Sequence, residues 1–274
     1  AAIKYLAAPR VCRNPPWPPD FTSDPGSRVR RALVTILKGR THPAYLGTLI
    51  KLTSDDWSDA EPHHDEPPSY PIARDAVAAL GAYGALSDEI GAVLVALAER
   101  TDDRLLSSEA LTVAAKHCGP GMRAKIWTLS FIDQPRWVRV DAIDALIMAD
   151  VVEREILDAV TAKLILRLAP PLAASATILL AAHGSVEVAV TTIERIAHST
   201  RHRALLLVGA WALAARDRGA AAGLLELLDP NHPAKRLLDL GQDELLPNTV
   251  LDNLGDARIR KAVRHWLKYS IMKD

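Results

Sequence analysis

The sequence predicts an all-α protein, an α-α superhelix in which about seven helical hairpins stack side by side. Three observations predict it. A short motif of small and branched apolar residues recurs at nearly equal intervals along the chain. Each step contains two stretches with helical periodicity, and alternating β-branched runs bounded by Asn-Gly turns do not occur.

The repeat has a small anchor residue in each copy. The steps between successive anchors are 44, 34, 32, 34 and 33 residues. The four nearly equal steps indicate a repeat of one helical hairpin, and the long first step contains an insertion. A single hairpin cannot hide both of its apolar faces, so stacking on its neighbours is required. The anchors are Ala32, Ala76, Ala110, Ala142, Ala176 and Gly209.

The array is expected to begin after an irregular N-terminal segment. Residues 1–23 are expected to form a partial hairpin or a strap, because the run 15–19 (Pro-Pro-Trp-Pro-Pro) favours extended backbone. Residues 24–274 are expected to form the helical array. An acidic, Pro-rich insertion at 54–69 interrupts it and accounts for the long first step.

Within the array, apolar spacing predicts helices over 72–84, 88–100, 138–149 and 152–167. Helix stop and start signals separate such helices, at Gly84 and Ser87, at the run 119–121 (Gly-Pro-Gly), and at Gly184-Ser185. The last helix, 257–269, has one apolar face and one basic face. That pattern is expected of a cap that ends a stack in water.

These phrases resemble those of HEAT-repeat proteins, in particular the short bacterial type related to phycobilin-lyase HEAT repeats. The resemblance lies in the runs 29–33 (Val-Arg-Arg-Ala-Leu), 72–81 (Ile-Ala-Arg-Asp-Ala-Val-Ala-Ala-Leu-Gly) and 258–262 (Arg-Ile-Arg-Lys-Ala). It covers residues 24 to 268 and implies a HEAT-like solenoid; it specifies the fold far better than the function. The insertion and a short, degenerate repeat near 233–253 depart from the family pattern.

Composition sets limits on the function. Lys plus Arg and Asp plus Glu are both 33, so the chain has no overall attraction to polyanions. Two cysteines, Cys12 and Cys118, make no disulfide framework, and a cytoplasmic location is the simpler expectation. No apolar run is long enough for a membrane helix. The missing initiator Met suggests a fragment of a longer protein, either a sensor or a scaffold part of it.

The insertion is the most unusual stretch of the sequence. Its carboxylates stand beside His63 and His64, so a metal site that includes Asp65 is one interpretation. Adjacent histidines on extended backbone point in different directions, which is poor chelation geometry. A solvated loop or a partner-contact loop are the alternatives, and Trp57 favours contact.

Arginines recur two positions before the anchor, as Arg30, Arg74 and Arg260. They either connect neighbouring hairpins or cover helix ends with their stems, or they form a basic ridge with other cations, including Arg139. We therefore expect a scaffold or adaptor that binds another protein or peptide on the concave surface of the solenoid. The partner-binding residues expected are Arg74, Arg139, Trp137 and Trp57.

A second interpretation concerns nucleic acid. Trp137 and Asp141 lie four residues apart, on one helical face. The pair is similar to the catalytic helix of HEAT-like alkylpurine DNA glycosylases, which implies an Asp141 carboxylate that stabilises a developing sugar cation. The groove arginine of that family has no equivalent here. In the structural interpretation, Trp137 packs beside a helix start and Asp141 is a surface residue.

No other enzyme motif occurs in the sequence, so no cofactor is required. His117-Cys118 could suggest a thiol nucleophile, but the pair ends a predicted helix just before the run 119–121. Nothing nearby in the sequence would orient the histidine as a base. The position therefore favours a buried or capping role for Cys118.

Overall fold

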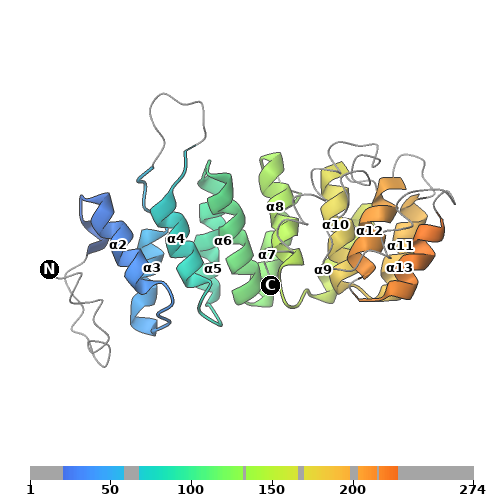
Figure 1. Ribbon diagram of the computed structural model, residues 1–274, viewed down its shortest axis with the longest axis horizontal. Coiled ribbons are helices and arrows are strands. Elements are labelled where there is room, and N and C mark those ends of the chain that lie inside the picture. The colour runs from blue at the N-terminus through green and yellow to red at the C-terminus, as the bar shows by residue number, and fades with distance from the viewer. Residues whose placement is uncertain are drawn as a thin grey trace. The chain divides into compact units, whose positions relative to one another are not determined.

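The computed structural model describes residues 21–58, 68–131, 134–165, 170–197, 203–214 and 216–227 (Figure 1). Within these ranges the chain forms twelve α-helices and two short 3-10 helices, and it contains no strand. The all-α prediction is therefore confirmed. The N-terminal residues 1–20, the middle of the insertion (59–67) and the expected C-terminal helix at 257–269 lie outside the described residues.

The chain divides into two compact units, Ala1–Ala145 and Leu146–Asp274. In the first unit, a 3-10 turn precedes the first α-helix and another precedes the second. The elements are η2 (Phe21–Ser23), α2 (Ser27–Leu37), η3 (Pro43–Tyr45), α3 (Leu46–Leu52), α4 (Pro71–Leu80), α5 (Asp88–Arg100), α6 (Arg104–His117), α7 (Pro120–Leu129) and α8 (Arg136–Ile147), which ends just past the division.

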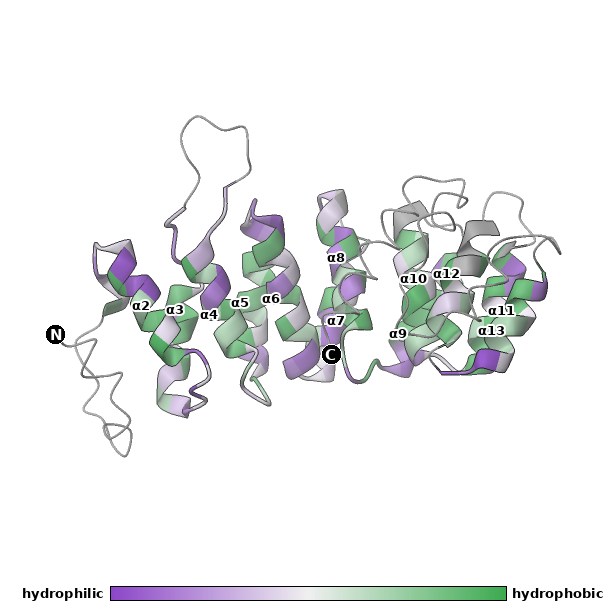
Figure 2. Ribbon diagram, in the orientation of Figure 1, coloured by the Kyte–Doolittle hydropathy of each residue, from purple (hydrophilic) through white to green (hydrophobic). Residues whose placement is uncertain are grey.

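The helices of the first unit form two layers. Helices α2, α4 and α6, the first helices of their hairpins, pack side by side. Helices α3, α5 and α7 form the second layer, in which α3 packs mainly on α4, α5 mainly on α6, and α7 on α5 and α6. Figure 2 shows hydrophilic residues on part of α2, α4 and α6, beside hydrophobic stretches. The apolar residues between the layers are fully buried; they include Leu37, Leu49, Ile72, Leu80, Leu94, Leu106 and Leu111.

The anchor register predicted from the repeat is confirmed. The six anchors fall on α2, α4, α6, α8, α10 and α12, one on the first helix of each successive pair. Ala76, Ala110, Ala142 and Ala176 are all 0% exposed. A small residue at the centre of each of these helices lets neighbouring helices approach closely, which is why the repeat keeps it.

Helix boundaries agree closely with the sequence patterns. The helix expected at 88–100 has these bounds, and Ser87 caps it by accepting a hydrogen bond from the backbone N–H of Ile90. The helix expected at 72–84 ends earlier, at Leu80, and 138–149 begins earlier, at Arg136. The helix expected at 152–167 begins later, at Arg154, because the Glu153 carbonyl accepts its first backbone hydrogen bonds.

The second unit has the same organisation. Helices α10 and α12 pack together, and α9, α11 and α13 form the neighbouring layer. Residues 172–181 of α10 are buried on every side, so α10 is the central helix of this unit. These hairpins, and those of the first unit, are compatible with an α-α superhelix. The elements are α9 (Arg154–Ile165), α10 (Pro170–His183), α11 (Val186–Ala197), α12 (Arg203–Ala214) and α13 (Arg218–Glu226).

A close helix approach in the second unit occurs at the Gly209 anchor. A Cβ at Gly209 would lie 2.6 Å from Cδ1 of Ile193 and 3.2 Å from its Cγ1 and Cγ2. Ile193 is fully buried on α11, so its side chain has no room to withdraw. We expect Gly209→Ala to lower the free energy of unfolding by about 1–2 kcal/mol, measured by urea denaturation with far-UV circular dichroism.

Two further variants test this explanation. Gly223→Ala on α13 is the matched control, because nothing lies within 4 Å of a Cβ at Gly223, and alanine there should be neutral or stabilising. Ile193→Val removes the clashing Cδ1 and should reduce the cost of Gly209→Ala. Fully additive effects of the two substitutions would show that this contact is not the cause.

Candidate functional site

The structure describes five of the residues that the sequence singled out for function. Trp57 follows α3, Arg74 lies on α4, and Trp137, Arg139 and Asp141 all lie on α8. They belong to three different elements of the first unit and are not gathered into one cluster. His63, His64 and Asp65, the metal-binding interpretation, lie outside the described residues.

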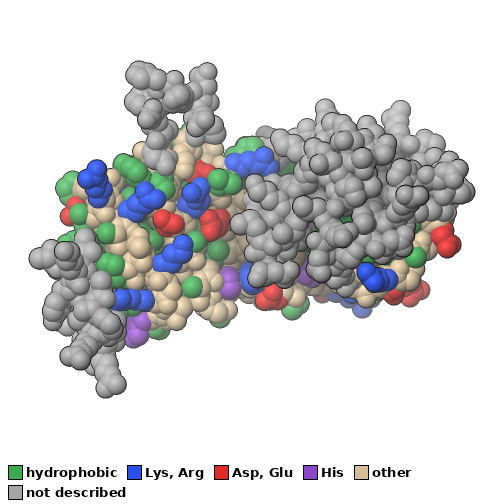
Figure 3. Space-filling view, in the orientation of Figure 1, with side chains coloured by type: hydrophobic (Ala, Val, Ile, Leu, Met, Phe, Trp, Pro, Cys, Tyr) green, Lys and Arg blue, Asp and Glu red, His purple; other side chains and the backbone are tan. Residues whose placement is uncertain are grey.

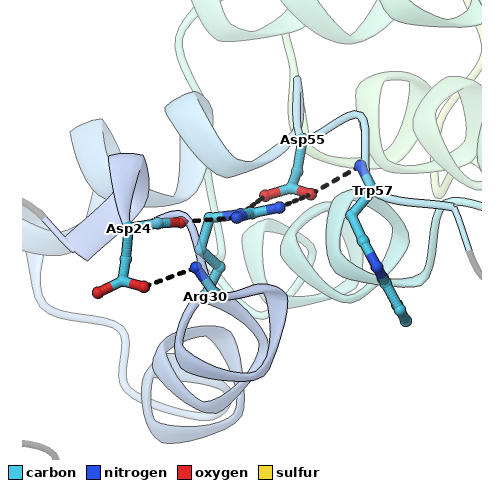
Figure 4. Close-up of polar contacts among 5 residues, drawn as sticks. Asp24, Arg30, Asp55 and Trp57 are labelled. Carbon is cyan, nitrogen blue, oxygen red and sulfur yellow. Dashed lines mark hydrogen bonds and ion pairs between the residues drawn. The ribbon is translucent and has the colours of Figure 1, made fainter.

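Arg30 is half-buried in a polar cluster (Figure 4). Its Nε donates to Oδ2 of Asp55 at 2.5 Å, and its Nη2 donates to Oδ1 at 3.3 Å. Its Nη1 donates to the Asp24 carbonyl at 2.6 Å. The side chains of Arg30 and Asp55 are 12% and 4% exposed. Arg30 thus ties α2 to the start of the insertion, which is the structural interpretation of this arginine.

Trp57 stands at the described edge of the insertion. Its backbone N–H donates to Asp55 Oδ1 at 3.1 Å, which fixes the chain as it leaves α3. The indole is half-buried and points away from the Arg30–Asp55 cluster in Figure 4. The arrangement places a large aromatic side chain beside a fixed backbone, as an anchor for a partner would require.

The outward side of α2, α4 and α6 forms a charged surface, which we call the first-helix face. It consists of Arg28, Arg31 and Lys38 from α2 and its C-terminal cap, Arg74 and Asp75 from α4, and Glu109 from α6. In Figure 3, Lys and Arg side chains are visible over this part of the first unit, with Asp and Glu side chains between them.

The charges that act on Glu109 show that Lys38, Arg74 and Asp75 lie near it. Burial raises the pKa of Glu109, whereas the positive charges of Arg74 and Lys38 lower it and the negative charges of Asp75 and Asp103 raise it. Glu109 therefore senses charges from α2, α4 and the start of its own helix. No residue of α4 is fully exposed, because this helix packs against α2, α3 and α6.

Arg139 and several other cations cap the C-terminal ends of helices. Arg139 Nε donates to the Ser130 carbonyl at 2.9 Å, and Arg123 Nη1 donates to the Cys118 carbonyl at 2.7 Å. In the second unit, Arg216 Nη1 donates to the carbonyls of Ala181 and Gly184, each at 2.8 Å. A cation at a helix C-terminus satisfies unpaired carbonyls and interacts favourably with the dipole. The sequence pattern predicts this role for the arginines two positions before the anchors and places Arg139 in a basic ridge instead.

Asp141 is buried, so the expectation of a surface residue is wrong. Its side chain is 1% exposed, and its only charged contact among described residues is Arg104 Nη2, 3.6 Å from Oδ1. Oδ2 has no hydrogen-bond partner within the described part of the chain. Burial raises the pKa of Asp141 to about 6, and the charge of Arg104 opposes the shift. This carboxylate therefore does not line an open groove.

Cys118 has the buried role that the sequence favoured. Its thiol packs beside Gly91, where an added Cβ would lie 2.8 Å from Sγ. Burial raises the pKa of Cys118 to about 11, so the thiol is protonated at neutral pH. A protonated, buried thiol is a poor nucleophile, and the neighbouring His117 uses its backbone carbonyl to accept from the Leu86 N–H.

Asp103 is a structural hub that sequence reasoning missed. Its Oδ1 accepts from the N–H groups of Leu105 and Leu106, which caps α6. Its Oδ2 accepts from the Tyr70 N–H at 3.0 Å, which holds the end of the insertion against α6. The sequence contained the local half of this signal, an Asp before a helix, but not the contact across the repeat.

Within the described ranges, no group of three or more His, Cys, Asp or Glu side chains could hold a metal ion. No described helix is both long and apolar enough to cross a membrane. Fold and surface thus define a class: an all-helical protein of layered hairpins with a charged outward face. Comparison of the chain with family models, with curated proteins and with solved structures gave no match.

Proposed function

We propose that this chain is a HEAT-like scaffold or adaptor that binds another protein through the first helices of its hairpins. The observation that supports this most is the layering of the first unit. Its core is filled by apolar side chains between two helix layers, which leaves the outward residues of α2, α4 and α6 available for contact. Side-by-side helices present such residues as one extended surface.

Arg74 and Trp57 are the anchors that this proposal favours. Arg74 is half-buried on α4 and has no hydrogen bond or ion pair to another described residue. Trp57 is half-buried on a backbone fixed by Asp55. Partly buried arginine and tryptophan side chains are the residues that most often dominate the affinity of protein interfaces.

Trp137 and Arg139 also remain candidate contacts, but Arg139 has a structural role as well. Trp137 is half-buried on α8 and remains a candidate contact. Arg139 already donates to the Ser130 carbonyl, so Arg139→Ala would change stability as well as binding. For DNA excision through Trp137 and Asp141, the burial of Asp141 offers no support, because a carboxylate that stabilises a sugar cation must contact the substrate.

The proposal predicts that a partner protein can be captured and that substitution of the anchor residues weakens its binding. The immobilised chain should retain a partner protein from an extract of its source cells, and the purified partner should bind in a calorimetric titration. Arg74→Ala and Trp57→Ala should each weaken that affinity about fivefold or more, since each removes a partly buried contact. Lys125→Ala, at an exposed site on α7, is the matched control. Equal affinity of all variants would refute these anchors.

A further inference from the structure

The first-helix face carries cations that the rest of the described chain leaves unpaired. Arg28, Arg31 and Lys38 follow one another at intervals of three and seven residues, on one exposed stripe of α2 and its cap. Neither these three nor Arg74 forms a hydrogen bond or ion pair through its side chain with another described residue. Arg30, on another side of α2, differs because Asp55 neutralises it.

The charges on this face are unevenly arranged. Every charged residue of α2 itself is basic, and the two carboxylates of the face, Asp75 and Glu109, belong to α4 and α6. The carboxylates of Asp24, Asp55 and Asp56 interact with Arg30, on another side of α2. Arg74 stands between the two sides, close enough to Glu109 for their charges to interact. The face therefore has a basic side around α2 and α4, although the whole chain has no net charge.

The partial burial of Arg74 on α4 strengthens ion pairs formed there. Arg74, Asp75 and Ala78 are the only residues of α4 that are not buried, and each is half-buried. Partial removal from water lowers the local dielectric constant and strengthens the attraction between opposite charges.

We propose that the basic side of the first-helix face, formed by Arg28, Arg31, Lys38 and Arg74, binds an acidic peptide segment of a partner protein. The inference rests on the proposed function and adds the chemistry of the partner. Carboxylates of the segment pair with the four cations. Asp75 and Glu109 restrict the binding to a limited register, because they repel carboxylates.

The same two carboxylates disfavour nucleic acid as the occupant. A phosphate backbone carries regularly spaced charge with no neutral positions, so it cannot avoid Asp75 and Glu109 as a mixed peptide can. A peptide in which acidic residues alternate with leucines can place its neutral positions beside them. Binding of duplex DNA is therefore an outcome that would contradict the proposal.

Fluorescence anisotropy with the full chain tests whether the basic side of the first-helix face binds an acidic peptide. The probe is a fluorescein-labelled peptide of Glu, Asp and Leu, and a second peptide replaces every acidic residue by Lys. We expect the acidic peptide alone to bind, more weakly as salt increases. Arg31→Glu and Arg74→Glu should each weaken binding about fivefold or more. Lys125→Glu on α7 changes the net charge equally and should have an effect below about twofold.

Asp75→Asn removes a repulsive carboxylate and should strengthen binding of the acidic peptide about two- to fivefold. A misfolded variant would lose binding, so a gain cannot be an effect of misfolding. No acidic-peptide binding at low salt, or an equal loss from Lys125→Glu, would overturn the inference. So would duplex DNA binding with the same sensitivity to Arg74→Glu. Capture of a partner that depends on Trp57, without acidic-peptide binding, would refute this inference and leave the proposed function standing.

Discussion

Asp55→Ala should destabilise the first unit by about 2–4 kcal/mol, because it removes the charged partner of a nearly buried guanidinium. Once Asp55 is gone, the other acceptor that Arg30 contacts among the described residues is the Asp24 carbonyl. The hydrogen bond that Arg30 donates to Asp55 also raises the pKa of Arg30. A guanidinium stays charged in proteins, so Arg30 cannot escape the cost by losing its proton.

Urea denaturation measures the overall decrease in the free energy of unfolding, and amide hydrogen exchange shows which helices are destabilised. Exchange of the α2 amides should accelerate more than that of α5, which lies in the other layer. Asp56→Ala is the matched control: this neighbouring carboxylate is exposed, and its removal should change stability by less than about 0.5 kcal/mol. If Asp55→Ala and Asp56→Ala were equally mild, the Arg30 cluster would contribute little to stability.

Asp141→Asn should stabilise the protein by about 1–3 kcal/mol at pH 8. The folded pKa of Asp141, about 6, lies above the ordinary Asp value of 3.8 because burial disfavours the charged form. The native state therefore holds this proton more tightly than the unfolded chain. Below about pH 4 the Asp141 carboxyl is protonated in both the folded and the unfolded state, and the protein keeps its full stability. As the pH rises through about 6, the buried carboxyl ionises and the free energy of unfolding falls. Asparagine has nearly the same shape and carries no charge to desolvate.

Thermal unfolding at pH 5 and pH 8 checks the sign. The gain from Asp141→Asn should be larger at pH 8, because the wild-type carboxylate is ionised there. Asp150→Asn, at an exposed site just after α8, is the matched control and should change stability by less than about 0.5 kcal/mol at pH 8. A marked loss of stability in Asp141→Asn at pH 8 would mean that the ionised carboxylate is better compensated than its contact with Arg104 suggests.

The helical architecture followed from local information. The anchors predicted from spacing lie on successive first helices, and the start signals at Ser87 and Ser185 became caps that accept hydrogen bonds from Ile90 and Val188. Helix periodicity and capping depend on residues within about four positions of one another, so they can be read from the chain itself. Ends were less accurate, as at α9, because the first backbone acceptor decides them.

The candidate site was only partly predictable, because contacts between distant parts of the chain decide the roles of its charged side chains. Arg30, Arg74 and Arg139 look alike in the sequence, and yet Arg30 pairs with Asp55, Arg139 caps a helix end, and Arg74 faces outward. Each outcome depends on a residue contributed by another part of the chain. The sequence pattern identified the arginines but could not distinguish a structural cation from an available one.

By itself, then, the sequence determined the helices, their repeat and the small residue at the centre of each first helix, because these follow from short-range periodicity. Only the tertiary structure decided which polar side chains are buried. Asp141 loses contact with water, and Arg104 reaches it from α6, far earlier in the chain. Desolvation and pairing of charges depend on such distant neighbours, and no local pattern encodes them.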